Sequence, residues 1–477
     1  MTRRATGGSP APNPAAAQAA APEAATSGWT GVVAAPLRRV RADLRDPLLR
    51  NGYALVLNVA VTAATGILYW ILAARVYQAP DVGRSSAAIS VMTLLASIGV
   101  LNFGGALSRF IPRAGEESKR LILIAYGCSA AAGAVVSLAY VLLYHLHLGL
   151  PSVLGSSLLP SVALGASVVA WCIFSLQDNV LTGLRQAVWT PLENGTYGVA
   201  KIALLLAFAS VSQRFGIFAS WIVPAAILTL PVNLLIFRRL VPRHTVSSAP
   251  RAVPLRMREV GRFVAGDYVG SLFARGTMYL LPVLVLARLG PQANAYFYIP
   301  FVTATTLDLV TIMLGNVLTV EGAHDQTRLR TLTASVVSRT LLMVVPTVAL
   351  LFLFAGRFLS LYGAQYSVQG SAVLRLLLVA VLARAATTVH NALARVHRRV
   401  GEIALVNAAA FFAVLGLSWA FLGAGGIRGA ALGYLIGQAA IAAAVTPRIV
   451  RLLRSGAPDA AENVARATED PWEPELP

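Results

Sequence analysis

The chain has 477 residues, of which 57% are hydrophobic and only 12% are charged, and its mean hydropathy is +0.68. A soluble domain usually carries about twice that share of charged residues, so the composition excludes an ordinary soluble protein and indicates a membrane protein with several spans. The formal net charge is +19, which alone would suit a nucleic-acid partner, but its placement along the chain argues otherwise.

The N-terminal segment does not resemble a signal peptide. Residues 1–36 are rich in Ala, Pro and Ser and lack an apolar core, so we expect a disordered cytoplasmic tail. Residues 37–50 place leucines and valines at helical spacing among arginines, which predicts either a basic interfacial helix on an anionic leaflet or a basic leader that only sets topology. Residues 453–477 turn acidic and are expected to form a second disordered cytoplasmic tail.

Between these tails lie about twelve apolar segments, each long enough to cross a hydrocarbon core of about 30 Å. Twelve spans are favoured over eleven or thirteen. The expected spans are 52–74, 84–111, 120–144, 157–180, 187–210, 216–237, 261–287, 295–319, 331–355, 368–393, 401–422 and 428–450.

The second half of the chain echoes the first. LAAR-VYQAPDVG closes its span on Arg75 and VLAR-LGPQANAY closes on Arg288, while DNVLTGLRQ (178–186) matches HNALARVHR (390–398), both at an offset of roughly 212 residues. Repeats of this kind in membrane proteins indicate two matching bundles around a central site. We therefore expect an all-α membrane protein of about twelve transmembrane helices, in two pseudo-symmetric six-helix lobes around a central cavity. The expected lobes are 51–240 and 261–452, with 241–260 as a basic cytoplasmic loop between them.

The basic residues are distributed unequally between the loops. Numbered from an inside N-terminus, the inner loops and tails hold about 24 Lys or Arg near the spans and the outer loops hold about 6. This bias predicts that both termini are cytoplasmic. The positive charge is then a topology signal together with contact to anionic membrane lipids, and no nucleic acid is expected. Arginine almost entirely replaces lysine, which is typical of a GC-rich bacterial genome, so we expect a bacterial plasma membrane.

No motif for catalysis or for a cofactor stands out. Cys128 and Cys172 fall within expected spans, and we find no His cluster with ligand spacing, no phosphate-cradling glycine loop and no nucleophile elbow. The outer loops are too short to hold an enzyme domain. We therefore expect no enzyme, no metal and no cofactor, and any chemistry must use ionisable residues inside the helix bundle.

Charged residues inside the spans are costly, at about 2.5–3.5 kcal/mol each at mid-membrane. The eight that lie well inside are Glu193, Lys201, Asp267, Arg275, Asp308, Arg339, Arg375 and Arg384. They must therefore face partners or a hydrated cavity.

Their spacing places several of them on single helix faces. Polar stripes recur every four residues at Glu193, Tyr197 and Lys201 and at Asp267, Ser271 and Arg275. On the tenth span a third stripe comprises Arg384, Thr388, Asn391 and Arg395. On the second span Asn102 and Arg109 share one helix face.

Two interpretations of these charges remain open. In one, pairs such as Asp267 with Arg275 or Glu193 with Lys201 lock helices together, and Arg75, Arg109, Arg288 and Arg395 near the boundaries merely reach for the interface. In the other, the excess of cations binds an anionic group, for which the arginine fork is well suited. Chloride, a lipid phosphate or another pairing would satisfy the excess too. The candidate binding residues are Arg109, Lys201, Arg275, Arg339, Arg375, Arg384 and Asn391, and the candidate ion-coupling or pairing residues are Glu193, Asp267 and Asp308.

The stretch NGYALVLNVAVTAATGILYWILAARVYQAPDVGRSSAAISVMTLLASIGVLNFGGALSRFIP (51–112) resembles the opening of bacterial polysaccharide flippases of the multidrug/oligosaccharidyl-lipid/polysaccharide exporter superfamily. The shared features are a first span ending LAAR, a short PDVG turn and a second span ending SRFIP. The resemblance implies two six-helix lobes that move a lipid-linked glycan from the inner to the outer leaflet. It also implies a basic cavity for the carrier pyrophosphate, although no motif maps individual arginines.

Three functions compete, with a purely scaffolding membrane protein as a further alternative. The first is a flippase for a glycan linked to undecaprenyl pyrophosphate, with the polymerase and glycosyltransferases of the same pathway as partners. The second is a cation-coupled multidrug antiporter of the same superfamily; the first span carries no Asp or Glu, but Asp267 and Asp308 leave this function open. The third is a membrane glycosyltransferase or polymerase, disfavoured because the first outer loop offers only Asp81, a candidate helix cap.

Overall fold

The computed structural model describes residues 47–146, 153, 157–248, 256–266 and 268–454. The chain forms two units, Met1–Gly52 and Tyr53–Pro477, and the helix bundle is the second of these. The expected tail at 1–36, most of the expected interfacial helix at 37–50 and nearly all of the acidic tail lie outside the described residues.

The described residues are almost entirely helical. In chain order the α-helices are α2 (Pro47–Val76), α3 (Ala79–Gly99), α4 (Phe103–Ala114), α5 (Ser118–His145), α6 (Leu158–Gly183), α7 (Trp189–Val211), α8 (Gly216–Leu235), α9 (Val241–Ser248), α10 (Met257–Gly266), α11 (Tyr268–His324), α12 (Leu329–Leu353), α13 (Ala355–Ser360), α14 (Ala364–Val396) and α15 (Val400–Arg454). Short turns η2 (Gly115–Glu117) and η5 (Gln326–Arg328) and the π-helical turn η3 (Ile236–Leu240) join some of them.

Within these residues, ten helices are long and apolar enough to cross a membrane. Two of them, α11 and α15, contain a non-helical glycine, Gly290 and Gly426, whose φ values are +83° and +55°. Only glycine adopts such angles at little cost, so each long helix folds back as two crossing segments. Twelve crossing segments result, and the expectation of an all-α membrane protein with twelve spans is confirmed.

Two boundaries differ from the sequence expectation. The expected span 84–111 is broken into α3 and α4, because Leu101 and Asn102 adopt positive φ values of +49° and +61° and interrupt the helix. The expected loop at 241–260 is partly helical: α8 continues through a π-helical turn into α9, and α10 begins at Met257. Here the chain stays helical beyond its apolar stretch, which hydropathy cannot reveal.

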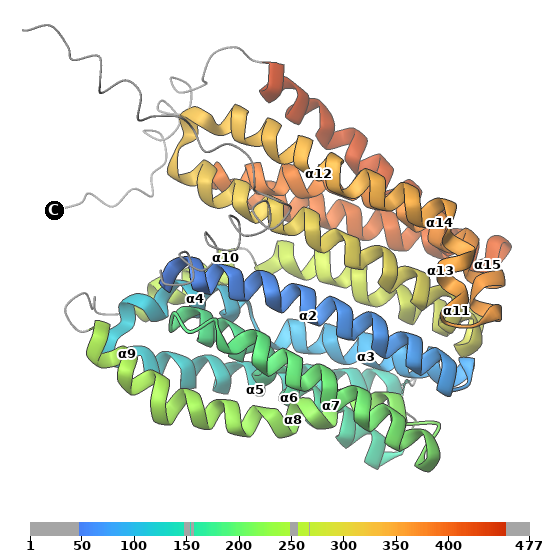
Figure 1. Cartoon of the computed structure of the whole chain (residues 1–477), viewed down its shortest axis with the longest axis horizontal. Coiled ribbons are helices and arrows are strands. Elements are labelled where there is room, and N and C mark those ends of the chain that lie inside the picture. Colours follow the sequence, from blue (N-terminus) through green and yellow to red (C-terminus); the bar gives the residue numbers. More distant parts are fainter. Residues whose placement is uncertain (1–46, 147–152, 154–156, 249–255, 267, 455–477) are drawn as a thin grey trace, which may run out of the picture. The chain divides into compact units, whose positions relative to one another are not determined.

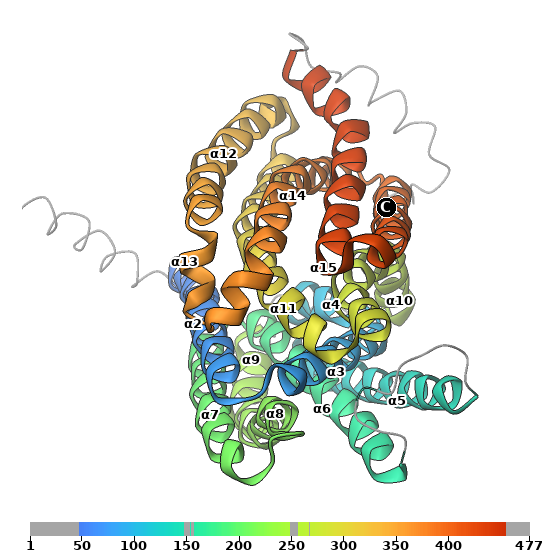
Figure 2. The same cartoon turned by 90° about the vertical axis from the view of Figure 1, so that its right-hand side faces the viewer.

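Helices of the two halves gather on opposite sides of the second unit. Figures 1 and 2 show α5, α6, α7 and α8 on one side and α12, α14 and α15 on the other, with α3 and α11 between them. The packing agrees, since α5 packs on α6 and α7 on α8, α14 packs on α15, and α3 of the first half packs along α11 of the second. The packing of α3 against α11 thus joins the two halves.

The internal repeat is visible in backbone detail. Arg185 and Arg398 lie 213 residues apart and have nearly the same left-handed φ, +57° and +56°. Each ends a helix in the same way. The N–H of Gln186 donates a hydrogen bond to the Leu181 carbonyl, and the N–H of Arg399 donates one to the Ala394 carbonyl, both at 2.8 Å. This is the Schellman type of helix end. The matching caps fix the repeat at 213 residues, the same offset as from Arg75 to Arg288 and one more than from 178–186 to 390–398.

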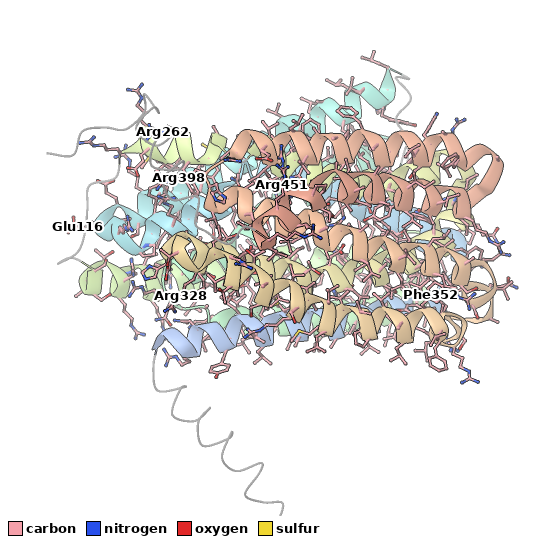
Figure 3. The ribbon with its side chains drawn as sticks, turned by 90° about the horizontal axis from the view of Figure 1, so that it is seen from above. Glu116, Arg262, Arg328, Phe352, Arg398 and Arg451 are labelled. Carbon is pink, nitrogen blue, oxygen red and sulfur yellow. The ribbon has the colours of Figure 1, made fainter. Side chains whose placement is uncertain are left out.

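We call the end of the helices near Arg75 the Arg75 end and the opposite end the Arg398 end. Figure 3 shows Arg262, Arg328 and Arg398 near one end and Phe352 near the other. The end with Arg262, Arg328 and Arg398 also carries Glu116 in this view, and it is the end that the charge bias predicts to be cytoplasmic.

The two halves are joined tightly at the Arg75 end. Asn294 on α11 donates hydrogen bonds to the Gly83 carbonyl at 2.8 Å and to the Ser86 hydroxyl at 3.2 Å on α3. A methyl group at Gly83 would overlap the Pro291 carbonyl. The Arg75 guanidinium donates to the carbonyls of Leu361 at 2.8 Å and Ser360 at 3.0 Å. Nearer the other end, Phe110 and Phe263 meet edge to face at 5.7 Å.

Candidate functional site

Three cavities lie in sequence through the bundle. The first, which we call the aromatic cavity, has a volume of about 370 Å³ and lies between α2, α6, α7, α8 and the second segment of α11. The second, the middle cavity, has about 330 Å³ and shares Trp171 and Ser175 with the first. The third, the arginine cavity, has about 250 Å³ and shares Arg275 with the middle cavity. Because neighbouring cavities share wall residues, the three lie next to one another in a row.

The aromatic cavity combines flat ring surfaces with hydrogen-bonding groups. Its aromatic residues are Trp70, Trp171, Phe174, Tyr197, Trp221 and Tyr362, and its polar residues are Thr62, Thr65, Ser175, Asp178, Asn194, Lys201, Thr303 and Thr306. Such a mixed lining can hold a ligand that has both apolar faces and polar edges.

Lys201 is held in an aromatic cage. Its side chain is buried, and its Nζ lies 4.3 Å from the ring centre of Trp221, 5.0 Å from Tyr197 and 5.1 Å from Tyr69. No ion pair links it to any residue in the described part of the chain, so the anticipated pairing with Glu193 is not seen there. The ring faces stabilise the ammonium through cation–π attraction.

A carboxylate outside the candidate residues also lines this cavity. Asp178 on α6 accepts hydrogen bonds from the Asn194 amide of α7 at 3.1 and 3.2 Å. The same amide donates to the side-chain amide oxygen of Asn58 on α2 at 3.0 Å. Three helices therefore meet at one polar cluster, which we call the Asp178 cluster (Asn58, Asp178 and Asn194). Asp178 belongs to the repeated motif at 178–186, which was the available signal.

Glu193, the residue before Asn194 on α7, is buried, with 6% of its surface exposed. Neither carboxylate oxygen has a hydrogen-bond partner among the described residues. Glu193, Tyr197 and Lys201 are all buried, so the polar stripe expected on this helix faces inward rather than toward lipid. A buried carboxyl group without a donor is costly, so Glu193 is a candidate for a role beyond helix packing.

The arginine cavity repeats the plan of the aromatic cavity in the second half. Asn391 donates to Asn407 at 3.0 Å, and Asn407 donates to the Gly270 carbonyl at 3.0 Å. Asn391 and Asn407 stand 213 residues after Asp178 and Asn194, so the same three-helix junction occurs twice. The second copy is neutral where the first carries a carboxylate.

The charges in the arginine cavity are predominantly positive. Arg384 forms an ion pair with buried Asp308 at 3.0 Å and donates to the Tyr434 hydroxyl at 2.9 Å. Arg275 and Arg395 also line the cavity. Arg275 is half-buried and forms no ion pair with any described residue. Its position in the walls of both the arginine and the middle cavity makes it the cation best placed to meet a ligand.

Three of the expected site residues are not assembled with the others. Arg109 is exposed and lies 4.9 Å from the ring centre of Phe263. Arg375 is exposed and donates to the Phe352 carbonyl at 3.1 Å near the end of α12. Arg339 is exposed and lines none of the three central cavities. Asp267 lies outside the described residues.

The boundary arginines of the two halves bind protein groups. Arg75 bonds to carbonyls of the second half, and the Arg288 guanidinium lies 3.7 Å from the ring centre of Trp419. Within the described ranges, no group of three His, Cys, Asp or Glu side chains is arranged to hold a metal ion. Cys128 is exposed and Cys172 buried, and both are free thiols.

Comparison with known proteins gives a clear fold and no family assignment. Neither a protein-family model nor a curated protein sequence matches the chain. Solved structures do match it. An inward-facing multidrug resistance MATE family transporter of the MOP superfamily aligns with a TM-score of 0.65 and 16% identity, covering 84% of this chain and 99% of the other.

Two further structures support the same architecture. The outward-facing conformation of a MATE family transporter aligns with a TM-score of 0.59 and 15% identity over 86% of this chain and 96% of the other. The lipid II flippase MurJ, in an inward closed conformation, aligns with a TM-score of 0.58 and 10% identity over 90% and 94%. The chain therefore has the helical membrane fold that the MATE transporters and MurJ share.

Proposed function

We propose that this protein is a flippase that moves a lipid-linked glycan from the inner to the outer leaflet of a bacterial plasma membrane by alternating access. The observation that carries the proposal is the series of cavities in which Arg275 lines both the middle and the arginine cavity. A fold shared by drug transporters and a lipid flippase fits either substrate class, so the cavity lining must separate them.

The arginine cavity suits an anionic head group. Arg384 is neutralised by Asp308, whereas Arg275 faces two cavities and has no acidic partner among the described residues. Arginine binds a phosphate through two parallel hydrogen bonds and stays charged, so a pyrophosphate would find a geometric and electrostatic match here. Undecaprenyl pyrophosphate is the carrier that this match favours.

The aromatic cavity suits the sugar end of the same molecule. A pyranose ring has C–H faces that pack on indole and phenol rings and hydroxyl edges that need donors and acceptors. Trp171 and Trp221 supply faces, and Asp178 and Asn194 supply hydrogen-bonding groups. In this proposal the glycan lies in the aromatic cavity while the pyrophosphate stays near Arg275 and the lipid tails remain in the bilayer.

The proposed cycle uses the two halves, 51–240 and 261–452, as lobes, with both termini cytoplasmic. In it, the contacts at the Arg75 end close the outer side, and they must separate for release. The polymerase and glycosyltransferases of the same pathway would be its partners, and anionic lipids its surroundings.

A second candidate, a cation-coupled multidrug antiporter, rests on a different observation. Asp178 and Glu193 are carboxylates that could bind a coupling ion, and Glu193 has no hydrogen-bond partner among the described residues. Aromatic cages bind organic cations. Lys201 argues against the binding of a cationic drug, because its own positive charge already occupies the cage. Glu193, Asp308 and the cluster remain candidate coupling residues for either function, as does Asp267.

The test is lipid analysis of a gene-deletion strain, complemented with wild type, Arg275→Ala or Arg339→Ala. We expect the deletion to accumulate a pyrophosphate-linked glycan facing the cytoplasm and to lose the surface polymer. Wild type and the exposed-site control Arg339→Ala should restore export, whereas Arg275→Ala should reach the membrane and fail to export. Unchanged lipid-linked glycans with altered sensitivity to cationic drugs would instead establish the antiporter.

A further inference from the structure

A fourth cavity lies apart from the central series. It opens at the Arg398 end of the second half, has a volume of about 820 Å³, and is lined by the end of α14 and both ends of α15. It shares no wall residue with the aromatic, middle or arginine cavities. The transport cycle proposed above makes no use of it.

One carboxylate organises the basic residues of this cavity. Glu402, which is largely buried, forms an ion pair with Arg448 and lies 3.4 Å from the Nε2 of His390 and 3.9 Å from the Arg399 guanidinium. These contacts draw the ends of α14 and of both α15 segments together. Glu402 is the sole acidic residue among the described residues that line the cavity, and it is shared by several cations.

Two further arginines of this cavity have no acidic partner among the described residues. Arg451 and Arg454 line the same cavity, are exposed, and form no ion pair with any residue that the structure describes. The Arg451 Nε has only a long contact, 3.4 Å, to the Pro447 carbonyl of its own helix. The helix end that carries them is fixed, because Arg330 of α12 donates to the Leu453 carbonyl at 2.9 Å. Two guanidinium groups therefore project from an anchored helix end, and Figure 3 labels one of them, Arg451.

Apart from His397, the rest of the lining is apolar. Leu393 and Val450 contribute side chains beside the arginines, at the ends of helices long enough to cross a membrane. A soluble phosphate would gain nothing from these apolar groups, whereas a phospholipid places its phosphate beside the start of its acyl chains. Basic pockets between helix ends are suited to anionic head groups.

From this arrangement we propose that the cavity binds the phosphate head group of an anionic phospholipid, with Arg451 and Arg454 as its principal ligands. The site is separate from the path of the transported molecule and does not depend on what that molecule is. Bound lipid would join the ends of α14 and α15 to the membrane surface. A diphosphatidyl head group, with two phosphates, would engage both arginines at once.

The experiment uses the purified full chain in a neutral detergent and follows its unfolding temperature as cardiolipin is added. A ligand that binds only the folded state raises that temperature in a saturable way. We expect the double variant Arg451→Gln/Arg454→Gln to need roughly tenfold more cardiolipin for half the effect, since each lost charged hydrogen bond weakens binding. Both residues are exposed, so the double variant should fold.

The matched control is Arg428→Gln, which removes an exposed arginine near the other end of the second segment of α15 and should respond to cardiolipin like wild type. Phosphatidylcholine should have no saturable effect, and inorganic pyrophosphate should be far weaker than the lipid. Equal stabilisation of the double variant and wild type, equal effect of phosphatidylcholine, or equal potency of pyrophosphate would each overturn the proposal.

Discussion

Asp308 and Arg384 form a buried ion pair beside the central cavities. Asp308 on α11 and Arg384 on α14 meet at 3.0 Å, and the Tyr434 hydroxyl of α15 accepts a further bond from the arginine. Three helices of the second half are thereby joined. Arg275, in contrast, has a cavity on either side and no acidic partner among the described residues. The two arginines should therefore respond differently to substitution.

Removing Arg384 should damage folding. Arg384→Ala leaves the buried Asp308 carboxylate unpaired, and breaking such a pair typically costs about 3–5 kcal/mol. We expect a lower unfolding temperature and less protein in the membrane. The double variant Arg384→Met/Asp308→Leu should recover much of the stability, because it leaves no uncompensated charge. Stability of Arg384→Ala equal to that of wild type would contradict the assignment of this pair as structural.

Lys201 should act as an internal competitor for cations. Replacing Lys201 with methionine removes the positive charge from the cage but keeps an apolar side chain of similar length. Lys201→Met should therefore bind the probe cation tetraphenylphosphonium several-fold more tightly than wild type. Quenching of tryptophan fluorescence would report this, since Trp221 and Trp171 line the cavity. Lys201→Arg, which keeps the charge, is the control and should resemble wild type. Equal affinity in all three proteins would show that the cage does not select against cations.

At the scale of elements, the contact between α3 and α11 depends on one missing side chain. Gly83→Ala places a methyl group against the Pro291 carbonyl, so the two helices must move apart. Overpacking of this kind typically costs about 1–3 kcal/mol, and we expect a lower unfolding temperature together with reduced export. Gly127→Ala on α5 adds the same methyl group where nothing lies within 4 Å and should be neutral. Similar behaviour of the two variants would show that the contact at Gly83 is loose.

The elements themselves were largely predictable, because apolar runs of about 20 residues have few alternatives to a membrane-crossing helix. The breaks within them were harder to foresee. Gly290 and Gly426 coincide with gaps between expected spans, but the left-handed turn at Leu101 and Asn102 carries no glycine at those two positions and interrupts an apolar run. Packing against neighbouring helices decides such a break, and packing is not encoded locally.

The site was only partly predictable from the sequence. Charge inside a span selected Lys201, Arg275, Arg384 and Asp308, since each such charge needs a partner or a cavity. Asp178 was missed because it stands near the end of its expected span, and its importance depends on Asn194 from the next helix. The rings around Lys201 come from three different helices, so only the folded chain reveals the cage.

At the scale of the whole molecule, the orientation in the membrane remains the main prediction. In a protein variant whose Cys128 and Cys172 are replaced, a single cysteine introduced at Gln213, between α7 and α8, should react with a membrane-impermeant thiol reagent in intact cells. A cysteine at Glu116, between α4 and α5, should react only after the membrane is opened, because the arginine bias places that end inside. Both positions lie at helix ends and are at least partly exposed. The reverse labelling pattern would invert the proposed direction of transport.

The bond from Arg75 to the second half has a consequence for how this protein tolerates change. Both acceptors, at Ser360 and Leu361, are main-chain oxygens. The side chains at those two positions are therefore free to vary without loss of the contact, and outside acidity cannot break it, because a peptide carbonyl does not take up a proton at any physiological pH. The contact at this end should therefore persist in relatives with different side chains in these exposed loops. It should open when the transported ligand binds, and not when the external pH changes.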